Sequence, residues 1–131
     1  MAEIPRASLF GKLNSLAYKS VEAATVFCKM RGNPYVELSH WIHQLLQTQN
    51  TDWHRIVDHF DIDPSRLATD LTASLDALPR GATSISDFSP HLEEAVREGW
   101  TYSTLMFGDS VVRTGHVLVG ILKTPGLRSV L

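Results

Sequence analysis

Cysteine is nearly absent from this chain of 131 residues, which contains only Cys28. A single thiol excludes an intrachain disulfide, so a hydrophobic core must hold the fold together, and a reducing cytoplasm is compatible with this composition. Cys28 lies within an apolar helical pattern, where a free cysteine behaves as a small hydrophobic residue. We therefore expect Cys28 to be a buried core residue.

The sequence also lacks an excess of positive charge, because 12 Lys and Arg are balanced by 14 Asp and Glu, for a net charge of −2. Proteins that bind nucleic acids or anionic lipid use a cationic surface. One segment has the helix lengths of a helix-turn-helix, but its second helix, residues 65–78, carries Asp70 and Asp76 against the single cation Arg66, which would repel phosphate. We expect neither nucleic acid nor a membrane as a partner.

Long apolar runs are missing too. No segment approaches the roughly 18 apolar residues of a membrane helix, and the first nine residues do not have the pattern of a signal peptide. The chain is 44% hydrophobic and 20% charged, which is typical of a folded globule and not of a disordered segment. The composition therefore predicts a single domain in the cytoplasm.

What the sequence does contain is an internal repeat. The stretch GNPYVELSHWIHQLL, residues 32–46, aligns without a gap with GDSVVRTGHVLVGIL, residues 108–122. The two copies are separated by 76 positions (116 − 40 = 76), and this offset superposes their glycines, valines, histidines and terminal leucines. A duplicated helical unit is the simplest cause, and such a repeat sets the architecture.

Hydrophobic periodicity predicts helices and no strand, so the predicted fold class is all-α. A long amphipathic helix is expected from Leu9 to Arg31, ended by glycine and proline. Start signals predict further helices at Leu38 or Ser39, at Thr51 or Asp52, at Asp63–Pro64, at Ser89–Pro90 and at Thr114. The buried stripe expected for the helix at Ser89–Pro90 consists of Leu92, Ala95, Val96, Gly99, Ser103 and Met106.

The repeat also predicts how the chain is divided. Residues 1–8 form a flexible tail, residues 9–78 are repeat one, residues 79–88 connect the repeats, and residues 89–131 are repeat two. Repeat one continues for two helices after its histidine-led helix, whereas the sequence stops soon after the corresponding helix of repeat two. We therefore expect repeat two to be truncated at its C-terminus.

Motifs for catalysis are absent. The sequence has no G-x-S-x-G elbow, no H-E-x-x-H pair and no Walker signature, so no catalytic residue is predicted. Four histidines lie close in sequence, at positions 40, 43, 54 and 59, but no carboxylate or cysteine stands at the spacing that a closed zinc site requires. Because His40 recurs as His116, we predict a structural role for this histidine, with hydrogen bonds to its loop, and neither a metal nor a cofactor.

Several apolar residues lie at the first turns of the two long helices or in the polar connection between the repeats. We predict that they line an exposed groove for an amphipathic partner helix, since segments that lead into corresponding helices can meet in a pseudo-symmetric fold. The predicted groove residues are Leu9, Phe10, Leu13, Ile85, Phe88 and Leu92. The alternative is that Leu13 and Leu92 belong to the core and that Phe88 is a hydrophobic staple before the Ser89 cap.

The paired units resemble the double Clp repeat at the N-terminus of Clp-family AAA+ unfoldases, over residues 9–131. The segments LFGKLNSLAYKSVEAATVFCKMRGNPYVELSHW, LPRGATSISDFS and RTGHVLVGILKTP are most similar to the ClpV type, also called TssH, of bacterial type VI secretion. Glutamate usually precedes the first histidine of a Clp repeat. Here Ser39 and Gly115 precede His40 and His116, a departure that fits the ClpV branch better than the protein-quality-control branch.

This resemblance implies a non-catalytic recognition domain of a hexameric ATPase, monomeric when isolated, with ATP and Mg²⁺ bound by AAA+ modules further along the chain. It implies that the partner is an N-terminal helix of the large sheath subunit, VipB or TssC, which the ATPase uses to disassemble the contracted sheath. The family groove involves the first helix and the region before the second repeat. The alternative is a general docking domain for adaptors or clients in protein quality control.

Overall fold

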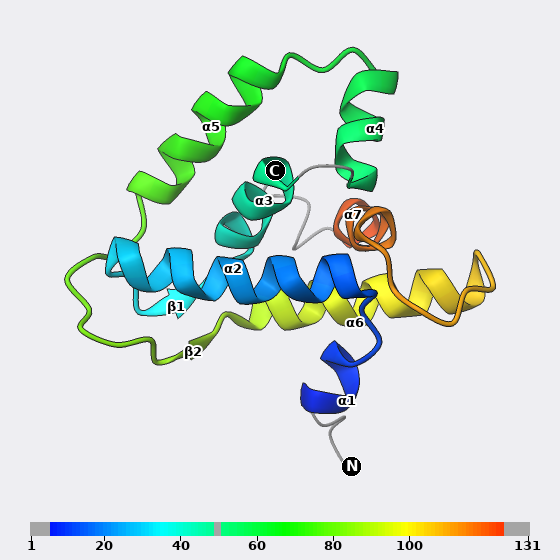
Figure 1. Ribbon diagram of the computed structural model, residues 1–131, viewed down its shortest axis with the longest axis horizontal. Coiled ribbons are helices and arrows are strands. Elements are labelled where there is room, and N and C mark those ends of the chain that lie inside the picture. Colours follow the sequence, from blue (N-terminus) through cyan, green and yellow to red (C-terminus); the bar gives the residue numbers. More distant parts are fainter. Residues whose placement is uncertain (1–5, 49–50, 125–131) are drawn as a thin grey trace.

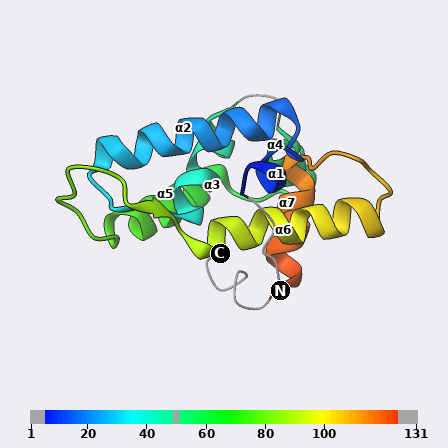
Figure 2. The same ribbon diagram turned by 90° about the horizontal axis from the view of Figure 1, so that it is seen from below.

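The computed structural model describes residues 6–48 and 51–124, and this part of the chain is helical, as predicted. Repeat one contains α1 (Arg6–Phe10), α2 (Ser15–Arg31), α3 (Leu38–Gln47), α4 (Asp52–His59) and α5 (Pro64–Asp76). Repeat two contains α6 (Pro90–Leu105) and α7 (Thr114–Lys123). The two long helices α2 and α6 run in opposite directions, and α3 packs on α2 as α7 packs on α6 (Figure 1). Figure 2 shows α2 and α6 as two separate layers.

Local capping chemistry accounts for most helix starts. Asn14 accepts a hydrogen bond from the backbone N–H of Ala17 at 2.9 Å, and Ser89 accepts one from His91 at 3.2 Å. Such side chains satisfy N–H groups that the first helical turn leaves without a partner. The predicted starts at Thr51, Asp63–Pro64 and Ser89–Pro90 are confirmed.

The predicted continuous helix from Leu9 to Arg31 is wrong, because the chain leaves the helix at residues 11–14. Asn14 caps α2, and Leu13 forms a parallel bridge with Val112 of repeat two. Both flanking helices bury apolar residues in the same core, so their spacing resembles that of one long helix. The predicted tail of residues 1–8 extends into α1, and residues 1–5 lie outside the described part.

The prediction that the chain has no strand is also wrong. Two short strands, β1 (Tyr35–Val36) and β2 (Asp87–Phe88), pair in parallel, with Val36 opposite Phe88. At two residues each, they are too short to produce a period-two pattern. Each repeat thus contributes one half of a reciprocal arrangement: the valine loop of repeat one pairs with the segment before α6, and Val112 of repeat two pairs with the segment before α2.

The N-cap residues of α2 and α6 also take part in this reciprocal arrangement. The backbone N–H of Ser89 donates to the carbonyl of Val36 at 2.8 Å, and the N–H of Asn14 donates to the carbonyl of Val112, also at 2.8 Å. Each long helix therefore begins on the loop of the other repeat. This reciprocity brings the two segments that precede α2 and α6 to the same region of the molecule.

The repeated histidines are structural, as predicted. Nδ1 of His40 accepts the N–H of Glu37 at 2.8 Å, and Nδ1 of His116 accepts the N–H of Arg113 at 3.0 Å. These bonds join the third residue of α3 and of α7 to its N-cap, as one half of a capping box. Because an N–H group can only donate, Nδ1 is unprotonated and the hydrogen lies on Nε2. His40 also meets Phe27 of α2 edge to face, with ring centroids 5.9 Å apart.

A second set of hydrogen bonds joins the repeats, between the start of α4 and the start of α7. The Asp52 carboxylate at the start of α4 accepts hydrogen bonds from Nη2 of Arg113 at 2.7 Å and from the N–H of Gly115 at 3.1 Å. Trp53 donates its indole N–H to the carbonyl of Thr114 at 2.7 Å. The hydrogen bond from Arg113 lowers the pKa of Asp52, against the opposing effect of burial.

The core contains residues of every described helix, including Cys28, as predicted. Helix α5 contributes the buried Leu75, and its Leu71 packs against the main cluster. The predicted stripe of α6 is confirmed for Leu92, Ala95, Val96, Gly99 and Ser103. The prediction that Met106 is buried is wrong, since this side chain is 61% exposed. Helix α6 ends at Leu105, and the chain turns at Met106, so the helical periodicity no longer directs this side chain inward.

Candidate binding groove between α1 and α2

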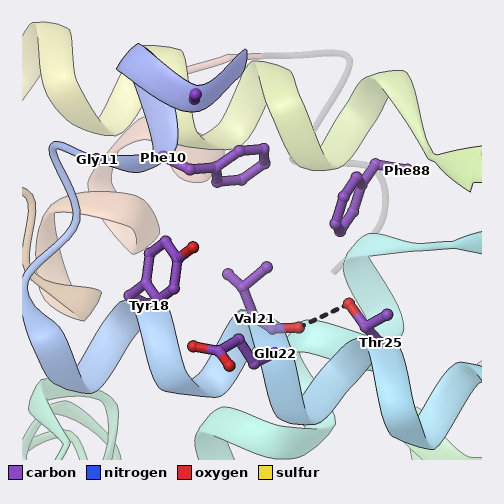
Figure 3. A pocket seen from close by; sticks show the side chains of 8 residues that line it. Phe10, Gly11, Tyr18, Val21, Glu22, Thr25 and Phe88 are labelled. Atoms are coloured by element: carbon purple, nitrogen blue, oxygen red, sulfur yellow. Dashed lines mark hydrogen bonds between the residues drawn. The ribbon is translucent and has the colours of Figure 1, made fainter.

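An open cavity of about 560 Å³ lies where α1 faces α2, and β2 closes one end of it (Figure 3). Apolar, aromatic and small residues dominate its wall. It is lined by Ala7, Phe10, Gly11, Tyr18, Val21, Glu22, Thr25 and Phe88. Ligand and peptide sites are commonly concave and apolar with few polar groups, so this is the candidate functional site.

Two phenylalanines bring the repeats together at the groove. The rings of Phe10, at the end of α1, and Phe88, in β2, have centroids 5.4 Å apart at an interplanar angle of 41°. Tilted aromatic pairs at this separation are favourable. Val21 of α2 points toward the space between them in Figure 3 and forms the floor. The reciprocal pairing of the repeats is what places these two segments side by side.

The predicted groove residues separate into two groups. Phe10 and Phe88 line the cavity, and Phe10, at 7% exposed, also belongs to the core. Leu9, Leu13 and Leu92 are buried in the core, which is the alternative that the sequence left open for Leu13 and Leu92. Ile85 packs against the core and is not part of the cavity wall.

One side of the groove was missed by the sequence analysis. Tyr18, Val21 and Thr25 recur at three- and four-residue spacing along α2 and therefore share one stripe. The signal was present in the sequence, because Tyr18 and Val21 flank the apolar face that periodicity assigns to the core. Tyr18 is 46% exposed, which marks this flank as available to a partner.

The polar chemistry of the groove is sparse. The Thr25 hydroxyl donates to the carbonyl of Val21 at 3.0 Å, so its hydrogen is already used. Glu22 is the one charged residue among the described residues that line the groove. This wall offers shape and apolar area, and it brings together no nucleophile and base.

The structure was also searched for metal and membrane features. Within residues 6–48 and 51–124, no group of three or more His, Cys, Asp or Glu could hold a metal ion. No helix in the same ranges is long and apolar enough to cross a bilayer.

Comparison with known proteins decides the family. The model of the Clp repeat N-terminal domain matches residues 12–131. The chain belongs to this family. The Clp repeat domain is a recognition domain, and the resemblance carried by the two histidine-led units is thereby confirmed.

Two relatives match the Clp repeat domain over nearly all of its length. The AAA+ ATPase ClpV1 of Pseudomonas aeruginosa is 66% identical over 131 residues, which are 100% of this chain. The chaperone protein ClpB of Yersinia enterocolitica is 45% identical over 128 residues, or 98% of this chain. The chain spans 14% of the length of each of these relatives.

Solved structures share the fold of this Clp repeat domain. A structure from work on the coevolution of the ATPase ClpV, the TssB–TssC sheath and the accessory HsiE protein in type VI secretion has 67% identity and a TM-score of 0.94, covering 98% of this chain and 80% of that chain. A complex of a ClpV N-domain with a VipB peptide has 22% identity and a TM-score of 0.85, covering 97% and 78%. The second likeness concerns the fold alone.

Proposed function

We propose that this Clp repeat domain binds an amphipathic helix of a type VI secretion sheath subunit in the groove between α1 and α2. The observation that supports this most directly is the apolar cavity lined by Phe10, Val21 and Phe88. A helix with apolar residues at three- and four-residue spacing matches an apolar groove of this kind. The partner class is suggested by the ClpV relatives and by the sheath with which ClpV was studied.

In this proposal the domain is the recognition part of a longer cytoplasmic ATPase of the ClpV kind. It delivers the sheath subunit to AAA+ modules that bind ATP and Mg²⁺ and assemble as a hexamer. In the same proposal the isolated domain is a monomer and acts in recognition, while the catalytic site belongs to the AAA+ modules.

The test is binding of a synthetic peptide of the N-terminal helix of a VipB- or TssC-type sheath subunit, measured by calorimetry. Phe88→Asp places a charge in the groove wall and is expected to weaken binding about 30-fold or more, since a well-filled anchor position contributes about 2 kcal/mol or more. Leu105→Asp is the matched control, because Leu105 is 80% exposed at the end of α6 and does not line the cavity. Circular dichroism checks that both variants are folded.

Unchanged affinity in folded Phe88→Asp would place the binding site elsewhere. Leu13→Asp is unsuitable for this test, because Leu13 is buried and bridged to Val112.

A second candidate function is docking of adaptors or clients in protein quality control, favoured by the ClpB relative. The two functions differ in partner choice. Binding of the sheath peptide in preference to a reduced, unfolded client protein supports the first. Equal binding of the unfolded client and the sheath peptide at the same groove would support the second.

A further inference from the structure

Among the described lining residues, the one charged side chain, Glu22, lies on one edge of the groove. Along α2, the lining residues Tyr18, Val21, Glu22 and Thr25 form a stripe about two turns long. Val21 is almost completely buried on the inner edge of this stripe, and Glu22 is exposed on the outer edge. Figure 3 shows Val21 directed toward the two phenylalanines and the Glu22 carboxylate lying to the side, below Tyr18.

The Glu22 carboxylate is available to a partner. It forms no hydrogen bond or ion pair with any residue in the described ranges. Lys19, three residues earlier on α2, does not line the cavity. A helix that covers the groove would remove water from one side of this carboxylate. Desolvation of an unpaired charge is unfavourable and would weaken binding.

We infer that Glu22 determines the specificity of the groove by pairing with a Lys or Arg on the bound helix, beside its apolar stripe. This inference rests on the proposed function. Glu22 stands between Tyr18 and Thr25 along α2, so the cation belongs near the middle of the bound segment and not at its terminus. A helix with the same apolar stripe and an acidic residue at that position places two like charges together and is rejected.

The experiment uses designed amphipathic helical peptides, acetylated and amidated at their ends, that share one apolar stripe. They differ only at one position flanking the stripe, which is Lys, Gln or Glu, and a second series varies the opposite flank. In one of the two series, the domain is expected to bind the Lys peptide about two- to fivefold more tightly than the Gln peptide, as for an exposed ion pair. The Glu peptide is expected to bind more weakly than both.

Substitution of Glu22 tests whether this residue is the cause. Glu22→Gln is expected to abolish the preference for Lys over Gln, and Glu22→Lys to reverse the order so that the Glu peptide binds best. Asp70→Lys is the matched control, because Asp70 is exposed on α5, outside the groove, and the change in net charge is the same. In wild type, salt at about 0.5 M is expected to reduce the preference, since the Debye length falls well below 10 Å.

The outcomes separate this inference from the function on which it rests. Equal binding of the three peptides in both series, with binding still lost in Phe88→Asp, overturns the role of Glu22 and leaves the groove in place. A preference that Asp70→Lys alters as much as Glu22→Lys also overturns it, because it would report net charge alone. If neither these peptides nor the sheath peptide bind wild type, the proposed function fails and the inference fails with it.

Discussion

The two repeats build the same loop with different chemistry. Each loop begins with a left-handed glycine, Gly32 at φ 70° and Gly108 at φ 67°, and the next residue meets Nε2 of the repeat's histidine. In repeat one, this residue is the buried Asn33, whose Oδ1 accepts from His40 at 2.9 Å. In repeat two it is Asp109, 49% exposed, whose Oδ2 lies 3.1 Å from Nε2 of His116. The histidine Nε2 is paired with a neutral amide where the pair is buried and with a carboxylate where the pair is exposed to water.

The helix pairs differ in a complementary way. In repeat one, the large Trp41 of α3 is fully buried and donates its indole N–H to Ser20 of α2 at 2.7 Å. In repeat two, Gly120 of α7 lies directly on Gly99 of α6, and a Cβ at Gly120 would stand 2.8 Å from the Gly99 nitrogen. The α6–α7 pair therefore has a close backbone contact at a glycine, whereas the α2–α3 pair is joined by a buried indole.

The largest effect is expected from adding a side chain at the glycine contact between α6 and α7. Gly120→Ala directs a methyl group against the α6 backbone, at 2.8 Å from N of Gly99 and 3.0 Å from C of Glu98. We expect a loss of about 3 to 4 kcal/mol in the free energy of unfolding, because a helix backbone cannot move aside as a side chain can. Urea denaturation measures it.

Position 44 of α3 is the equivalent site in repeat one and already carries a glutamine. Gln44→Ala is expected to change the free energy of unfolding by less than about 0.5 kcal/mol. Similar losses at the two positions would show that the close glycine contact is not specific to repeat two.

The second comparison removes each histidine in turn. His40→Ala deletes a fully buried ring, its bond to Glu37 and its bond to Asn33, and we expect a loss of about 3 kcal/mol. His116→Ala is expected to cost about 1 to 2 kcal/mol, because water can solvate the exposed Asp109 that it leaves behind. Thermal and urea unfolding measure both, and a greater loss for His116→Ala would reverse the proposed ranking.

The last comparison concerns pH. Burial, followed by the charges of Arg31 and His43, lowers the pKa of His40 from 6.5 to about 4. His40 is therefore protonated near pH 6.5 in the unfolded chain but stays neutral in the folded chain until about pH 4. The contribution of His40 to the free energy of unfolding is fully present above pH 6.5 and decreases as the pH falls from 6.5 toward 4. Between about pH 7.5 and pH 5, this group alone is expected to remove about 2 kcal/mol.

The control for pH is the His40→Gln variant, which keeps a hydrogen-bonding side chain but cannot titrate. Its stability should fall less than that of wild type over the same interval, and the other titrating groups cancel in the difference. Parallel stability curves for the two proteins would show that His40 takes up its proton equally in both states.

Most of the helices could be predicted from the sequence, and part of the groove could be. Caps such as Asp63 and Ser89 act within three residues, so their effect is visible locally. The groove was predicted through Phe10 and Phe88, but Tyr18 and Thr25 were missed, because periodicity does not distinguish a flank that faces solvent from one that meets a neighbouring segment. For the same reason Leu9 and Leu92 were predicted to line the groove, although both are buried in the core.

The sequence by itself determined the duplicated unit, with its glycine, its histidine and the polarity of its helices, because these depend on contacts within a few residues. The reciprocal pairing of Val36 with Phe88 and of Leu13 with Val112 was decided only by the tertiary structure. These partners are far apart along the chain, and short pairings of this kind leave no local pattern. The groove depends on them, since they bring the Phe10 and Phe88 segments together beside α2.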